Sequence, residues 1–319
     1  MLEPWVQQLP TAAQSVIHGG FLAVSTFFVL SGFVLARSYA GTKWNRRNVI
    51  EYTAARYARV YPVYLVSLLV LAPIMYEYLS LPERSGRMEV LANYGFVLQG
   101  WAGPAVVQWN TPAWSLSCEL FFYACFPLLL LVIRKVRWPL LIALSLIAAV
   151  LLPHTGIPPA WKPVLHLSDF AMGVAASGIY DSMRARGWLA GRGYWLYGPG
   201  AAGLLAFLSA RAAVFAPSVP LLNAAILVGL AIGGGVPARA LSTRAALLLG
   251  KASYSMYILH IPLLWWFKRT WFYTSGGISH PVAAVLYIGA VVVFSGAIWR
   301  SVEEPANRWI RAWVTARLT

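Results

Sequence analysis

Residues 112–133 read PAWSLSCELFFYACFPLLLLVI, an apolar run in which Glu119 is the one charged side chain. A run of this length crosses the hydrocarbon core of a bilayer as a helix. A carboxylate inside it must be desolvated or kept in a wet cavity, which is costly. The alternative is a buried pair with an Arg or His that fixes helix packing. Because of that cost, we favour a functional role for Glu119.

The composition extends this interpretation to the whole chain. Of its 319 residues, 59% are hydrophobic and 11% are charged, whereas soluble domains carry about 25% charged residues. We therefore predict an all-α polytopic membrane protein with one integral-membrane domain over residues 1–319. Nine membrane segments are expected, at about 20–38, 58–78, 112–133, 138–152, 164–180, 194–210, 213–236, 247–267 and 281–302.

The net charge of +15 does not indicate nucleic-acid binding, because Lys and Arg lie in short loops between apolar runs. With nine segments, 19 of the 25 basic residues fall on one side, which the positive-inside rule assigns to the cytoplasm. The C-terminus is then cytoplasmic. Residues 305–318 predict an amphipathic helix at the cytoplasmic interface, for which a simple anchor is the plainest role.

Polar residues in four stretches are candidate site residues. Trp114, Ser115 and Glu119 lie within about a turn and a half, and Ser115 and Glu119 share a face. Glu119 could bind a hydroxyl or act as a base. Arg56 and Arg59, three residues apart, could hold phosphates, although snorkelling orientation charges are the more probable reading on spacing alone.

Two histidines belong to the other stretches. His166 and Asp169 share a helix face and could bind hydroxyls, or form only a helix-start pair. His260 lies mid-segment, two residues before Pro262, which frees a backbone carbonyl, but such a histidine is often structural. Glu304 could pair with Arg308 at the junction that begins with Glu303.

No phosphate loop, zinc pattern, dinucleotide fingerprint or nucleophile elbow is present. We expect neither a metal nor a bound cofactor. Cys118 and Cys125 are interpreted as small core residues.

Five stretches together resemble the membrane-bound acyltransferase-3 family, and they occur in the family's order. They are Phe-Phe-Val-Leu-Ser-Gly-Phe at 27–33, Arg-x-x-Arg-x-Tyr-Pro-x-Tyr at 56–64, Trp-Ser-Leu-x-x-Glu-x-x-Phe-Tyr at 114–123, Ser-Tyr-Ser-x-Tyr-x-x-His-x-Pro at 253–262 and Glu-Glu-Pro at 303–305. The resemblance implies a ten-helix enzyme of the bacterial inner membrane. Such enzymes move an acyl group, usually acetyl from acetyl-CoA, to a hydroxyl of a cell-surface glycan or glycolipid.

The resemblance also implies residue roles. Arg56 and Arg59 match arginines on the donor side, to which we add Tyr61 and Ser31. Glu119 matches the family's intramembrane glutamate. The predicted acceptor-side residues are Trp114, Ser115, His166, Asp169 and His260.

The chain departs from the family pattern at its beginning. The family's first helix carries a histidine held to be catalytic, and here no apolar span precedes residue 20. His18 is the candidate for that histidine, although it lies several residues too late. Nine segments plus one missing helix make ten, so we expect a first helix upstream of this sequence.

The sequence therefore predicts an O-acyltransferase that uses a cytoplasmic acyl-CoA and acts on a glycan or glycolipid. A base would deprotonate the acceptor hydroxyl, which then attacks the thioester. Two alternatives stay open. One is a transporter or flippase for a glycolipid or anion, which the lack of internal repeats disfavours. The other is an inactive homologue truncated at its N-terminus.

Overall fold

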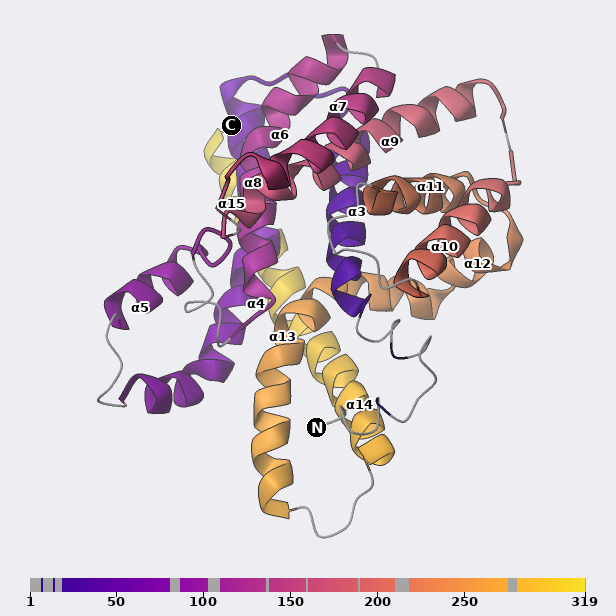
Figure 1. Cartoon of the computed structure of the whole chain (residues 1–319). Coiled ribbons are helices and arrows are strands. Elements are labelled where there is room, and N and C mark those ends of the chain that lie inside the picture. The colour runs from indigo at the N-terminus through magenta and orange to yellow at the C-terminus, as the bar shows by residue number, and fades with distance from the viewer. Residues whose placement is uncertain are drawn as a thin grey trace. The chain divides into compact units, whose positions relative to one another are not determined.

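The computed structural model describes residues 7, 14, 19–80, 87–102, 110–135, 138–158, 160–188, 190–209, 218–274 and 280–318 (Figure 1). All regular elements in these ranges are helices, and no strand occurs among them. His18 lies outside the described residues.

The elements are η1 Gly19–Phe21, α3 Leu22–Tyr39, α4 Arg46–Ser80, α5 Arg87–Gly95, α6 Ala113–Lys135, α7 Trp138–Leu151, η3 Leu152–His154, α8 Lys162–Leu165, α9 Leu167–Ala185, α10 Tyr194–Ser209, α11 Ser218–Ile232, α12 Gly235–Leu241, α13 Arg244–Thr274, α14 His280–Ile298, η4 Trp299–Glu303 and α15 Glu304–Leu318.

Five of the described helices are long and apolar enough to cross a membrane, at Leu22–Tyr39, Arg46–Glu77, Ala113–Leu130, Arg244–Thr270 and Pro281–Leu318. A sixth span arises if α11 and α12, which meet at a bend of 78°, count as one broken helix. These helices establish an integral membrane protein, and the predicted number of nine is not confirmed. The predicted segments at 138–152, 164–180 and 194–210 are helical as α7, α9 and α10. These three helices are not both long enough and apolar enough to count as membrane spans.

Contacts divide the chain into two compact units. The first, called the α4–α13 unit, comprises the described parts of Lys43–Ser117 and Arg244–Thr319. The second, called the α3–α9 unit, comprises the described parts of Pro4–Thr42 and Cys118–Thr243. Helix α6 contributes its first turns to one unit and the rest to the other. The single domain over 1–319 stays a prediction.

Two glycines bring α3 and α9 into backbone contact inside the α3–α9 unit. A Cβ added at Gly32 would lie 2.1 Å from the carbonyl oxygen of Phe170, and one at Gly173 would lie 1.9 Å from that of Val29. Each helix therefore presents a glycine to the backbone of the other, the packing that small residues allow between membrane helices.

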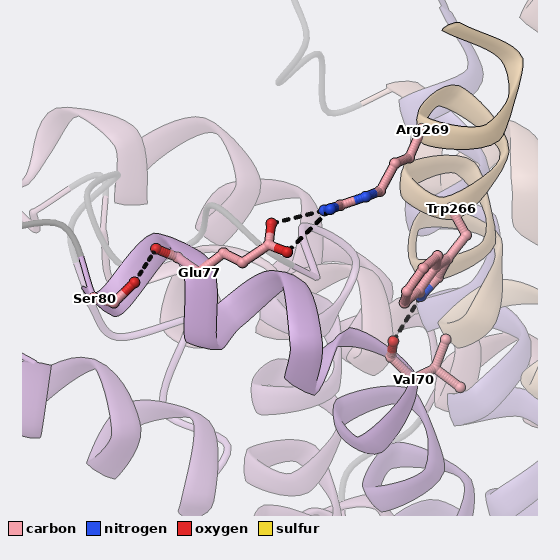
Figure 2. A network of polar contacts seen from close by, with 5 residues as sticks. All are labelled: Val70, Glu77, Ser80, Trp266 and Arg269. Carbon is pink, nitrogen blue, oxygen red and sulfur yellow. Dashed lines mark hydrogen bonds and ion pairs between the residues drawn. The ribbon is translucent and has the colours of Figure 1, made fainter. Parts of the chain in front are cut away.

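Helices α4, α13, α14 and α15 belong to the α4–α13 unit, and α13 and α14 run side by side (Figure 1). The indole N–H of Trp266 on α13 donates to the Val70 carbonyl oxygen of α4 over 2.7 Å. Near the same end, Arg269 forms two bonds, of 2.7 and 3.0 Å, with the Glu77 carboxylate (Figure 2). The Ser80 hydroxyl donates to the Glu77 carbonyl oxygen. The bonds of Trp266 and Arg269 connect α4 to α13, whereas the Ser80 bond lies within α4.

Arg269→Gln is expected to lower the free energy of unfolding by less than about 1 kcal/mol, because both partners are exposed and solvent screens the pair. Thermal unfolding of the purified protein in detergent measures this change. Lys268→Gln, at the neighbouring position, removes a cation without removing the ion pair and controls for net charge. A larger loss for Arg269→Gln alone would contradict the expectation.

Candidate functional site

Glu119 is buried in α6, with 3% of its surface exposed. The Tyr123 hydroxyl, one helical turn further on, donates to its Oε1. Residues three and four apart lie above one another on a helix, which explains why this tyrosine reaches the carboxylate. The burial expected for Glu119 is confirmed, whereas its role stays a prediction. Tyr123 was part of the motif but was not singled out from the sequence.

His166 and Asp169 form the predicted pair at the start of α9. His166 Nδ1 lies 3.1 Å from Asp169 Oδ2, and the two side chains are 17% and 9% exposed. The His166 ring packs against Phe28 of α3, and Phe28 packs edge-on against Phe122 of α6. The Phe28 ring therefore links the His-Asp pair to the helix that carries Glu119.

Lys162 is a neighbouring cation that sequence reasoning missed. It begins α8, just before the His166–Asp169 pair. Partial burial lowers the pKa of its ammonium group. In the sequence it is a single lysine ahead of an apolar segment. Such a lysine predicts only which side of the membrane that end of the segment faces.

A second group of predicted residues gathers in the α4–α13 unit. Ser115 Oγ lies 2.8 Å from the hydroxyl oxygen of Tyr257, so α6 and α13 are joined by a hydrogen bond. His260 Nδ1 lies 2.6 Å from the Tyr257 carbonyl oxygen. A carbonyl oxygen only accepts, so Nδ1 carries a proton in this bond. Trp114 is half-buried beside Ser115.

Pro262 explains a further contact between these helices. Proline has no backbone N–H, so the carbonyl oxygen of Ile258, four residues earlier, loses its helical partner. The Asn110 side chain donates to that oxygen over 3.2 Å and to Ser67 Oγ over 3.0 Å. The freed carbonyl expected from the sequence is thus satisfied by a residue fully buried just before α6.

Tyr257→Phe and Ser115→Ala are each expected to lower the free energy of unfolding by about 1 kcal/mol, because each removes one side of a buried hydrogen bond. The double variant is expected to lose less than the sum, with a coupling of at least about 0.5 kcal/mol. Denaturant unfolding of the four proteins in detergent measures the cycle. Strict additivity would show that the two hydroxyls do not interact.

A cavity of about 560 Å³ lies in the α4–α13 unit. Four of its lining side chains are cations and two are carboxylates. Glu303 is 7% exposed and accepts a hydrogen bond from Ser255 Oγ over 2.5 Å. The lining residues are Arg59 of α4, Gly250 and Lys251 of α13, Trp299 and Glu303 of the π-helical turn η4, and Glu304, Asn307, Arg308 and Arg311 of α15.

The other predicted donor-side residues lie elsewhere. Arg56 is half-buried and is not among the described residues that line the cavity; its guanidinium lies 6.0 Å from the centroid of the Tyr52 ring. The Tyr61 hydroxyl donates to the Gly95 carbonyl oxygen over 2.8 Å. Ser31 is a half-buried residue of α3. One of these four predicted residues, Arg59, therefore faces the cavity.

The expected pair between Glu304 and Arg308 was wrong. The nearest cation to the Glu304 carboxylate among the described residues is Arg300, at 3.9 Å and one helical turn in the other direction. Arg300 and Arg308 are each four residues from Glu304, so the sequence does not show which of them pairs with it. In the folded chain Arg308 lines the cavity instead. No group of three His, Cys, Asp or Glu residues that could hold a metal occurs in the described ranges.

Comparison with known proteins gives a consistent result. The family model described as an acyltransferase domain matches residues 3–300. The chain is 28% identical over 350 residues to acyltransferase MdmB of Streptomyces mycarofaciens, covering 95% of this chain and 84% of that protein. It is 33% identical over 123 residues to protein 2 in the picA locus of Rhizobium radiobacter, covering 33% of this chain and 64% of that protein. No solved structure matches the chain.

Proposed function

The chain belongs to the acyltransferase 3 family and is a membrane acyltransferase, and from this premise we propose that it moves an acetyl group from cytoplasmic acyl-CoA to a hydroxyl of a glycan or glycolipid. Membership of an acyltransferase family favours an enzyme over the transporter alternative. The proposal concerns the donor, the acyl group and the acceptor.

The observation that carries the proposal is one cavity lined by residues of two family stretches and by a residue just before a third. Arg59 comes from the second stretch, Lys251 precedes the fourth by two residues, and Glu303 begins the fifth. They lie on three helical elements that are far apart in the sequence. The cations exceed the carboxylates by two positive charges, and a polyanion complements such a lining. Acyl-CoA carries several phosphate groups and therefore suits this cavity.

The acceptor hydroxyl needs a group that takes its proton. We assign Glu119 to this side, where it binds the hydroxyl or acts as the base. In the transfer, the hydroxyl oxygen forms a bond to the thioester carbonyl carbon, the C–S bond breaks, and the CoA thiolate leaves. Positioned hydrogen-bond donors stabilise the oxyanion between these events. His166 and Asp169, which belong to the same unit as Glu119, supply polar groups for an acceptor rich in hydroxyls.

The sidedness of the reaction remains part of the proposal. An acyl-CoA donor is cytoplasmic, and the positive-inside distribution puts Arg59 and the residues of α15 on that side. The same distribution assumes nine spans and a cytoplasmic C-terminus. A bacterial inner membrane is the compartment in which such an enzyme would meet both substrates.

Transfer from doubly labelled acetyl-CoA tests the proposal. Membranes that contain the chain, and an upstream-extended version of it, are incubated with acetyl-CoA labelled separately in its acetyl and adenosine groups. The acetyl label is expected in a base-labile ester on the glycan or glycolipid fraction, whereas the adenosine label stays in solution. Membranes without the chain are the control. Failure of both versions to transfer the acetyl label would overturn the proposed donor.

A further inference from the structure

We propose that the C-terminal helix α15 is a substrate-binding element: Lys251, Arg308 and Arg311 hold the phosphate groups of the donor's nucleotide end, beside the indole of Trp299. The assignment rests on the proposed function, because it takes acyl-CoA as the donor. The sequence by itself suggested only an interfacial anchor for this helix.

The first argument is that these three cations have no partner in the described part of the chain. No ion pair or side-chain hydrogen bond is formed by Lys251, Arg308 or Arg311 within those ranges. By contrast, Arg37 and Arg269 are paired with carboxylates. These cations are exposed to solvent, and they offer N–H donors to an anion that enters the cavity. The three side chains therefore form a site for phosphate.

The second argument is the division of α15 into two faces. Glu304, Arg308 and Arg311 recur at helical spacing and line the cavity. Trp309 and Trp313, four residues apart, fall on the other side of the helix, where their rings stack at 6.5 Å. Arg317 covers the Trp313 ring at 3.9 Å. The exposed aromatic face suits a membrane interface, which leaves the cavity face available for a ligand.

The third argument comes from the π-helical turn η4 that precedes α15. Both ends of this turn, Trp299 and Glu303, line the cavity. Insertions of this kind are frequent at functional sites because they change which side chains face inward. The Glu303 carboxylate is held by Ser255 on α13. Trp299 supplies an aromatic face on which a nucleotide base can stack.

The ligand class follows from these parts together. Phosphate groups of lipid headgroups share the chemistry that the three cations recognise. A headgroup, however, makes no use of an aromatic face inside the cavity. A nucleotide base can stack on that face, and a cavity of about 560 Å³ has the size of sites for small molecules and cofactors. The observations therefore favour the nucleotide end of CoA.

Binding of CoA to the purified full chain tests the assignment, in nanodiscs of phosphatidylcholine alone so that anionic lipid is absent. Lys251→Gln, Arg308→Gln and Arg311→Gln are each expected to weaken CoA binding by about ten-fold, which is the loss of one charge-assisted hydrogen bond. Arg317→Gln removes a cation from the other face of α15 and is the matched control. This control is expected to bind CoA as tightly as the wild type.

The outcomes separate this assignment from the proposed function. If the wild type binds CoA and transfers acetyl from it, but the three variants bind CoA as tightly, the assignment alone fails. It fails equally if Arg317→Gln weakens binding as much as Arg308→Gln. If the wild type binds no CoA and transfers no acetyl group from it, the proposed donor fails and the assignment fails with it.

Discussion

Glu119→Gln is expected to reduce the rate of acetyl transfer by about 100-fold or more. A carboxylate that accepts the proton of the acceptor hydroxyl contributes on this order, and an amide of the same shape cannot accept that proton. The side chain is 3% exposed and bonded to Tyr123, so the substitution keeps the volume and leaves an oxygen for the tyrosine hydroxyl. The initial rate of label transfer from acetyl-CoA, divided by the amount of folded protein, measures the effect.

Two comparisons decide between the functional and the packing interpretation of Glu119. Glu89→Gln changes an exposed carboxylate on the short helix α5 and is expected to leave the rate unchanged. Thermal unfolding of both variants is recorded in detergent. A Glu119→Gln protein that unfolds at lower temperature but transfers acetyl normally would establish the packing role and remove Glu119 from the reaction.

Gly173→Ala is expected to lower the free energy of unfolding by about 3 kcal/mol, or to prevent folding of the α3–α9 unit. Its new Cβ would meet the Val29 carbonyl oxygen at 1.9 Å and the Phe33 nitrogen at 3.0 Å. Both atoms belong to the backbone of α3, so no side chain can rotate away, and the two helices must separate. The yield of monodisperse protein and its thermal unfolding measure the loss. Gly32→Ala meets the Phe170 carbonyl oxygen in the same way.

Gly289→Ala is the control for these glycine substitutions. It lies on α14, and nothing lies within 4 Å of a Cβ added there. Because alanine favours a helix over glycine by up to about 1 kcal/mol, this variant is expected to be as stable as the wild type or slightly more stable. A Gly173→Ala protein that behaves like Gly289→Ala would show that α3 and α9 do not approach so closely.

The helices and their order could be predicted because hydropathy and length act locally. The runs that contain Phe28, Glu119 and His260 are continuous and apolar, and each became a helix close to the predicted bounds. Span number was harder to predict. Whether α7, α9 and α10 cross a membrane depends on which other helices cover their polar residues. The sequence of one helix does not show this. The break at η4 was also missed, since no proline or glycine in Trp299–Glu303 marks it.

By itself, the sequence determined that Glu119 lies inside a membrane helix, that Pro262 frees a carbonyl, and that the chain resembles an acyltransferase family. Each of these depends on residues within a few turns of one helix. The tertiary structure alone decided that Asn110 satisfies the freed carbonyl and that Tyr257 meets Ser115. It also decided that Arg59 faces the cavity that Lys251, Arg308 and Arg311 share, whereas Arg56 and Tyr61 do not line it. The physical reason is that spacing along the chain determines which residues share a helix face. The direction in which that face points is set by packing between helices that are far apart in the sequence.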